Sequence, residues 1–325
     1  MIDDLPWLEA PWQRAAAALL GGRFPQGLLI LGNRGLGRGR LARAIAAARL
    51  CMQPQADGRA CGTCASCRQV AAGAHADLVE VGLLEDKTQI LVDQIRELSR
   101  ALSLASGSRG LRCAIIRSAE KMKAAAANAL LKTLEEAPDG VSIIMVTERL
   151  AALPVTIASR SLQLRVSAPE EAVALDWLRG QEARDDWPLL LALSAGAPLA
   201  AMSQAEEWPG SPEEDIRLLG EAVAGRTDPI AVAGKLKSLP LERLGALVAW
   251  LAQGALYQQF ADAPSAALRD FGVKAHQADR RALYRVWYSA RTVAVDNASL
   301  NAELARERLI LLFVDALHRP LARSS

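Results

Sequence analysis

A glycine-rich loop constrains the fold of this chain more than any other feature of its sequence. The apolar run Leu28–Leu31 leads directly into the loop, and the helical pattern of Arg40–Leu50 follows it. Four glycines punctuate the eight residues between these segments: Gly32, Gly35, Gly37 and Gly39. A strand, a loop of this kind and a helix form the phosphate-binding loop of many nucleotide-binding proteins, in which backbone amides surround the phosphates. The sequence therefore predicts an α/β domain with such a loop after its first strand.

The side chains of this loop differ from those that phosphate chemistry requires. In a working loop, a lysine reaches the β and γ phosphates and a Ser or Thr hydroxyl holds magnesium. Arg38 and Gly39 stand at these two positions. Arginine can still bind phosphate, whereas glycine offers no oxygen to a metal. We expect the loop to keep the backbone shape of a phosphate-binding loop but to lack its chemical activity. The alternative is that the glycines only form the turn between a strand and a helix.

The remainder of the first half predicts a largely parallel sheet flanked by helices. Three further strands are expected at Leu78–Val81, Arg112–Ile116 and Val141–Thr147, and two helices at Thr88–Leu102 and Ala124–Glu136. In a hydrolysing enzyme, the strand at Arg112–Ile116 would end in carboxylates that coordinate magnesium and activate water. Arg117 and Ser118 stand there instead. Hydrolysis of a nucleotide by this chain is therefore not expected.

Four cysteines lie close together in the sequence: Cys51, Cys61, Cys64 and Cys67. Overlapping Cys-x-x-Cys pairs with one upstream partner have the spacing of a metal site, and four thiolates complete a closed tetrahedral zinc site. One structural zinc per chain is expected, with no role in turnover. The alternatives are an iron–sulfur cluster, although the Cys-Pro of the bacterial ferredoxin pattern is missing, or unrelated thiols. Arg49, Arg59 and Arg68 are expected to offset the negative charge of the site. His75 is interpreted as an ordinary histidine and Cys113 as a packed apolar side chain.

The sequence predicts three domains: residues 1–167 with the zinc module at about 51–67, residues 168–208, and residues 209–325. Leu164–Val166 is the last run with strand character before the first boundary. At the second, Ser211 as N-cap, Pro212 at the first helical position and two following glutamates mark a helix start. The last domain predicts helices with two buried apolar stripes: Leu244, Leu247, Val248 and Leu251, and Leu309, Leu312, Phe313 and Ala316.

The charge balance argues against a dedicated nucleic-acid binder. Lys and Arg total 38 and Asp and Glu total 36, which leaves a net charge of +2, so the strongly basic balance of such proteins is missing. Apolar runs such as Leu309–Val314 are too short to span a bilayer, and the acidic first residues lack the pattern of a secretory signal. A soluble protein of the reducing cytoplasm, without a membrane partner, is expected.

Two further stretches are the most specific in the chain. Asn128–Pro138 has the sequence NALLKTLEEAP, and Leu153–Arg160 has the sequence LPVTIASR. With the glycine loop and the cysteines, they resemble the clamp-loader family of AAA+ ATPases and, within it, the delta prime subunits of bacterial DNA polymerase III. The resemblance covers Pro11–Arg160 and, more loosely, the helical remainder including Asn301–Leu304.

The resemblance implies an AAA+ domain of the α/β P-loop class with an inserted zinc module, a small helical lid and an all-α collar for oligomerisation. It implies a non-hydrolysing stator in a ring with gamma or tau ATPase subunits and a delta subunit, which together load the sliding clamp onto primed DNA. In the family, the arginine of a Ser-Arg-Cys segment projects into the neighbouring subunit's nucleotide site. Arg160 matches this arginine, and Ser161 replaces the cysteine. The lid's nucleotide-sensing arginine is replaced by Leu199.

Two other functions remain open. An active clamp-loader ATPase of the gamma or tau type shares the zinc module and the LLKTLEE stretch, although the residues at the loop and after the strand oppose it. A zinc-dependent nucleic-acid binding module without ring partners is opposed by the near-neutral charge. Phosphate release by the isolated chain tests the first, and salt-dependent affinity for duplex DNA tests the second.

Overall fold

The structure is a computed structural model that describes residues 2–22, 24–85, 87–104, 110–257, 259–260, 266–275, 278–296 and 301–318. It contains two compact units. The first comprises Met1–Ala174 with Ala197–Ala200, and the second comprises Leu175–Gly196 with Ala201–Ser325. The predicted division into three domains stays a prediction.

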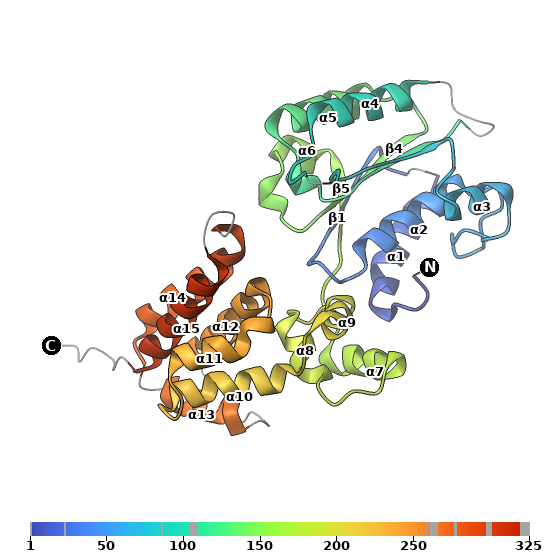
Figure 1. Cartoon of the computed structure of the whole chain (residues 1–325). Helices are drawn as coiled ribbons and strands as arrows, with labels where there is room; N and C mark the ends of the chain where they lie inside the picture. The colour runs from blue at the N-terminus through green and yellow to red at the C-terminus, as the bar shows by residue number, and fades with distance from the viewer. Residues whose placement is uncertain are drawn as a thin grey trace. The chain divides into compact units, whose positions relative to one another are not determined.

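A parallel five-stranded sheet forms the centre of the first unit as far as the structure describes it (Figure 1). Its strands are β1 (Gly27–Leu31), β2 (Leu78–Val81), β3 (Arg112–Ile116), β4 (Val141–Thr147) and β5 (Ser161–Arg165). They lie in the order β2-β3-β4-β1-β5. The first four confirm the strands predicted from the sequence. Because all strands run the same way, the loops that follow β1, β3 and β4 meet at one edge of the sheet.

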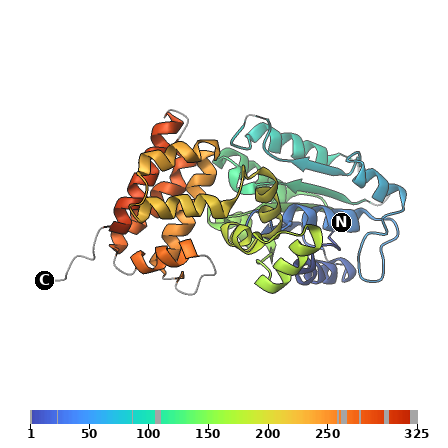
Figure 2. The same ribbon diagram turned by 60° about the horizontal axis from the view of Figure 1, so that its bottom comes forward.

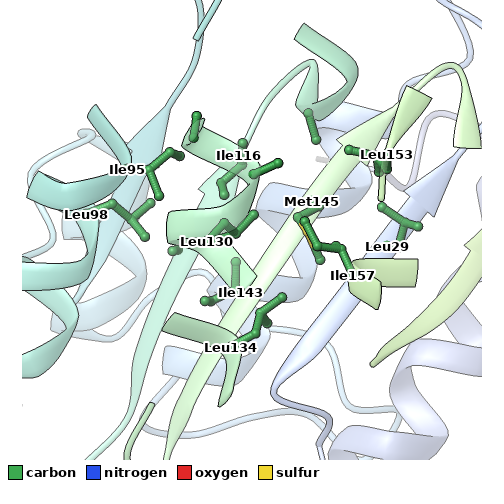
Figure 3. Packing of buried hydrophobic residues seen from close by; sticks show 14 of the residues in the cluster. Leu29, Ile95, Leu98, Ile116, Leu130, Leu134, Ile143, Met145, Leu153 and Ile157 are labelled. Carbon is green, nitrogen blue, oxygen red and sulfur yellow. The ribbon is translucent and has the colours of Figure 1, made fainter. Parts of the chain in front are cut away.

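Helices cover both faces of this sheet. Within the described part of the first unit they are η1 (Pro6–Leu8), α1 (Glu9–Leu20), α2 (Arg38–Leu50), α3 (Ala65–Ala71), α4 (Val92–Ser103), η2 (Ala119–Lys121), α5 (Ala124–Glu136), η3 (Leu150–Ala152) and α6 (Val155–Ser159). Leu29 and Leu31 point to the face covered by α4 and α5, where Ile95, Leu98 and Leu130 complete a buried cluster (Figure 3). Strand side chains alternate, so Leu28 and Ile30 face α1 and α2 on the other side.

Apart from β1 and α2, which begin one and two residues earlier than predicted, two elements differ from their predicted bounds for identifiable reasons. The last strand covers Ser161–Arg165 rather than Leu164–Val166, because it pairs with β1 in the register Gly27↔Ser161 to Leu31↔Arg165. It is an edge strand with several exposed residues, which weakens its apolar pattern. Helix α4 begins at Val92 rather than Thr88, because Ile90 forms a parallel bridge with Met122 and cannot be helical at the same time.

From α7 onward the described chain contains helices only, and several of the last helices pack against one another (Figures 1 and 2). They are α7 (Glu171–Gln181), α8 (Trp187–Leu193), α9 (Pro198–Glu207), α10 (Pro212–Val223), α11 (Pro229–Lys235), η4 (Leu236–Ser238), α12 (Leu241–Leu256), α13 (Ala266–Ala275), α14 (Arg280–Asp296) and α15 (Ala302–His318). No single helix in the described ranges is long and apolar enough to cross a membrane; α8 and α9, bent by 110°, pass this test of length and composition only as a pair.

The predicted features of the helical half are mostly present. The first apolar stripe is fully buried on α12, and three of the four residues of the second are buried on α15. Leu312 is the exception, with 37% of its surface exposed, since it lies on the outer side of its helix. Ser211 occupies the N-cap position of α10 as predicted, but its side chain makes no capping hydrogen bond.

Candidate functional site

The glycine loop connects β1 to α2 at the carboxyl edge of the sheet. Gly37 is the N-cap residue of α2 and has a φ of 83°, a left-handed conformation that favours glycine. Leu36 is buried, and its carbonyl accepts a hydrogen bond from Trp7 Nε1 at 2.9 Å. The carbonyl of Gly35 accepts a hydrogen bond at 3.1 Å from the backbone N–H of Leu199, in the stretch that clusters with the first unit. Two backbone carbonyls of the loop therefore accept hydrogen bonds from other segments of the protein.

Arg38, at the position of the phosphate-binding lysine, forms an ion pair within the chain. Its side chain is only 10% exposed, and its Nη2 lies 3.0 Å from Oε1 of Glu148, the residue after β4. The backbone N–H of Glu148 donates to Glu120 Oε2 at 3.3 Å. A phosphate in the loop would have to displace the Glu148 carboxylate from Arg38 to use this charge. Glu148 was not predicted from the sequence, since the two partners are 110 positions apart and meet only through the sheet.

Arg117 stands at the end of β3, where a hydrolysing enzyme would have a carboxylate. It pairs with Oε2 of Glu80 on β2. Arg43 of α2 binds the same carboxylate with two hydrogen bonds of 2.9 and 3.2 Å. Burial opposes ionisation of Glu80, but the two guanidinium groups outweigh it and hold the pKa of this carboxyl below its usual value. Ser118 adopts a left-handed φ of 54° at the start of η2.

The end of β3 is therefore a structural ion-pair network. Its residues are Arg43, Glu80 and Arg117, of which only Arg117 was a predicted site residue. Glu80 lies in the middle of a short strand, where a carboxylate is an unusual residue. A carboxylate within a strand was therefore the sequence feature that could have indicated a buried or paired charge.

The four predicted cysteine ligands come together at one place. Cys51 is the C-cap residue of α2, Cys64 is the N-cap residue of α3, Cys67 lies in the first turn of α3, and Cys61 lies in the loop between the helices. All four Sγ atoms lie within 4.8 Å of one another, with 4.0 Å between Cys51 and Cys64 and 3.9 Å between Cys61 and Cys67. A tetrahedral site with Zn–S bonds of 2.3 Å has sulfur–sulfur distances of about 3.8 Å. The sulfur positions therefore fit one zinc ion.

Backbone amides around the cluster point at its sulfurs. The N–H of Cys61 donates to Cys51 Sγ at 3.3 Å, that of Cys64 to Cys61 Sγ at 3.3 Å, and that of Cys67 to Cys64 Sγ at 3.4 Å. Hydrogen bonds from the backbone at Thr63 and Cys64 lower the pKa of the Cys61 thiol to about 6, and the N–H of Cys67 lowers that of Cys64. Burial raises the pKa of Cys67 to about 12. The amides stabilise negative sulfur, as metal-bound thiolates require.

His75 and Ser66 support the cluster from outside it. The backbone N–H of Asp77 donates to His75 Nδ1 at 3.0 Å, so Nε2 carries the proton of the neutral ring and donates to Ser66 Oγ at 2.9 Å. Ser66 Oγ donates in turn to the carbonyl of Leu50 at 2.7 Å. This chain of hydrogen bonds connects the residues preceding Cys51 and Cys67. His75 is not among the clustered ligand atoms in the described chain, and Cys113 is fully buried in β3.

Arg59 fastens the cysteine module to the N-terminal segment. Its guanidinium pairs with Asp3 at 2.7 Å, Glu9 at 2.6 Å and Asp57 at 3.0 Å, and it lies 5.2 Å from the ring centroid of Trp12. Three carboxylates around one arginine leave no net positive charge for the sulfurs. The structure thus shows what Arg59 binds, and the expectation that it offsets the charge of a metal site stays a prediction.

Arg160 is the C-cap residue of α6, immediately before β5. Its side chain is 46% exposed, and its Nη2 lies 3.1 Å from Glu135 Oε1 on α5. Its Nη1 donates to the backbone carbonyl of Thr156 at 3.2 Å. Ser161 donates through Oγ to the carbonyl of Ile157 at 2.8 Å, so the residue in place of the family's cysteine supports the same turn. Arg160 thus lies at the surface of the first unit.

Comparisons with known proteins agree with these features. A family model described as DNA polymerase III, delta subunit, matches residues 8–170. The DNA polymerase III subunit delta' of Pseudomonas aeruginosa is 32% identical over 334 residues, covering 96% of this chain and 97% of its own. Other delta' subunits match over 62% of this chain and of their own length. The tau subunit of Escherichia coli is 32% identical over 147 residues, 45% of this chain and 22% of its own.

A solved structure shares the fold. It is a DNA polymerase III gamma subunit-related protein from Thermotoga maritima, with a TM-score of 0.51 and 16% sequence identity over 95% of this chain and 100% of its own. The family model spans half of the 325 residues, and the Pseudomonas relative matches nearly from end to end. The chain therefore belongs to the DNA polymerase III delta subunit family, with relatives named delta' and with a fold that it shares with the gamma subunit-related protein.

Proposed function

We propose that this chain is a non-hydrolysing, delta prime-type subunit of a bacterial clamp loader, which acts on the nucleotide of a neighbouring subunit. The observation that carries the proposal is the pairing of Arg38 with Glu148. A nucleotide-binding loop needs its cation available to phosphate, and here a carboxylate neutralises it. Gly39 offers no metal ligand, and Arg117 is paired with Glu80. Catalysis of phosphoryl transfer in cis lacks its metal ligands and its base.

The family relationship supports a proposal about the partners of this subunit. The chain would sit in a ring with gamma or tau ATPase subunits and a delta subunit, and the assembled ring would load the sliding clamp onto primed DNA. Residues 168–208 would form the helical lid and residues 209–325 the collar through which the subunits assemble; the all-helical character of the described chain after α7 supports this division.

The cysteine module would hold one structural zinc. Cys51, Cys61, Cys64 and Cys67 would supply four thiolates, and the ion would tie the end of α2 to the start of α3. With four protein ligands no coordination position is left for water, so the site would have no part in turnover. The amide–sulfur hydrogen bonds and the Ser66–His75 contact support a rigid module.

Arg160 would supply the trans function. Its guanidinium is permanently charged and planar, and it can bind two oxygens of a γ-phosphate that is being transferred. The half-exposed position at the edge of the first unit supports an encounter with another subunit. As a source of charge on the neighbour's ATP, Arg160 would accelerate hydrolysis by about 10³ to 10⁵, the range of arginine fingers.

An active ATPase of the gamma or tau type is the second candidate, favoured by the 32% identity to a tau subunit over 45% of this chain. The two functions differ in one measurable property. The isolated full chain should release no phosphate from Mg-ATP above background and bind it weakly or not at all. Turnover that disappears in Arg38→Ala would contradict the proposal and establish the second candidate; Arg40→Ala, which changes an exposed arginine of the same helix, is the matched control.

A further inference from the structure

The partner of Arg160 on the neighbouring helix has no role in anything proposed so far. Glu135 lies on the last turn of α5, and its Oε1 accepts from Arg160 Nη2 at 3.1 Å. The second contact, from Arg160 Nη1 to the carbonyl of Thr156, stays within the turn that ends α6. Arg160 is therefore held from two sides, once by its own helix and once by a different element.

These two contacts restrict a flexible side chain and use only two of its donors. A free arginine side chain samples many rotamers, and ordering it costs about 2 kcal/mol. Its guanidinium carries five N–H donors. One is used by Glu135 and one by Thr156, so three remain for an incoming group. Geometry of this kind orients the guanidinium before a partner arrives, and because the side chain is half-exposed, unlike that of Arg38, its three remaining donors stay accessible to a phosphate.

The adjacent glutamate does not share this role. Glu136 pairs with Lys132 on its own helix at 3.9 Å, and both of these side chains are largely exposed. Glu135 and Glu136 are neighbours on the same helical turn with the same chemistry, yet they differ in partner. Glu136 therefore serves as a control for any effect of charge or helix propensity at the end of α5.

We propose that Glu135 is the positioning residue for Arg160, which fixes the direction in which this guanidinium meets the phosphate of the neighbouring subunit. The inference rests on the proposed trans function of Arg160. Glu135 touches no substrate and acts only through the arginine. A half-exposed ion pair contributes little to folding, so its loss should change the rate of the neighbour's hydrolysis and leave this chain folded.

The test uses the complete clamp loader reconstituted with full-length variants of this chain, and it measures DNA- and clamp-stimulated ATP hydrolysis. Glu135→Gln removes the charge at constant size and should lower kcat about two- to fivefold, the range of a surface ion pair, with little change in KM for ATP. Glu135→Ala should lower it at least as much, and Glu136→Gln should behave as wild type. The defect should shrink in high salt, because salt screens the wild-type pair.

A double-mutant cycle separates positioning from other roles. Glu135→Gln should have no further effect in the Arg160→Ala background. Wild-type rates for both Glu135 variants, beside an impaired Arg160→Ala, would overturn the positioning role alone. An added defect in the double variant would likewise overturn it, since Glu135 would then act without the arginine. A normal rate for Arg160→Ala would overturn the proposed trans function and this inference with it.

Discussion

Two glycines of the same loop should respond in opposite directions to the same substitution. Gly37 has a φ of 83° as the N-cap residue of α2, and a Cβ there would lie 2.8 Å from Leu5 Cδ1 and 3.2 Å from Leu8 Cδ1. An L-residue in the left-handed region costs about 1–2 kcal/mol, and the two leucine methyl groups can move aside at a smaller cost. Gly37→Ala should therefore lower the free energy of unfolding of the first unit by about 1–2 kcal/mol.

Gly39 lies in the first turn of α2, and a Cβ there would meet no atom within 4 Å. Alanine in place of glycine within a helix stabilises by about 0.5–1 kcal/mol. Gly39→Ala should therefore be neutral or stabilising, and the two variants should differ by about 1.5–3 kcal/mol. The backbone does not require glycine at position 39, so the missing metal ligand is not forced by the fold.

The assay is hydrogen exchange of β1 and α2 in increasing urea. Exchange resolves the first unit, whereas a chain of two units need not unfold in one step. Gly22→Ala is a useful control, because Gly22 also has a positive φ, of 67°, but has no atom near its Cβ position. Equal effects at positions 37 and 39, or a destabilising Gly39→Ala, would refute the loop conformation on which the argument depends.

Three further predictions concern the metal site and the ion pairs. Elemental analysis of protein purified without chelator should find one zinc per chain; iron, or no metal, would contradict this. In Cys64→Ser, the amides of the cysteine module should exchange hydrogen faster while those of the last helices stay protected. The contribution of Glu80 to stability is present above its ordinary pKa of 4.5 and is lost as pH falls through its lower folded value. Glu80→Gln should therefore weaken the protein near neutral pH and reduce its loss of stability in acid; parallel curves for both proteins would rule this out. Arg59→Ala should destabilise the first unit by about 1–2 kcal/mol, since it removes three ion pairs and the contact with Trp12; an unchanged urea midpoint would show that the network contributes nothing.

Local patterns predicted the sheet well. Strands β1, β3 and β4 agree with their apolar runs, because buried strands of a parallel sheet are apolar on both faces, and the half-buried edge strand β2 was found from a shorter run. The edge strand β5 was displaced, since one of its sides is exposed and its register is set by pairing with β1. The start of α4 was missed because Ile90 pairs with Met122, a contact between segments 32 positions apart.

The sequence indicated individual residues of the candidate site but not which of them pair with one another. The cysteine spacing identified the cluster because its members are near in sequence, and local chain geometry brings them together. The carboxylates that bind three of the predicted site arginines were not found. Glu148, Glu80 and Glu135 lie on different elements from Arg38, Arg117 and Arg160, and only the packing of the sheet and its helices joins them. No single-sequence pattern encodes such contacts.

We propose that this chain acts on its neighbour's ATP through Arg160 and not on a nucleotide of its own. The most direct test is the stimulated ATPase rate of the reconstituted clamp loader carrying Arg160→Ala, with assembly checked by native mass measurement. We expect an assembled complex whose adjacent ATPase site is slowed by orders of magnitude. Arg160→Lys should rescue the rate only weakly, because lysine lacks the planar two-pronged donor. An assembled complex with an unchanged rate and normal clamp loading would contradict it.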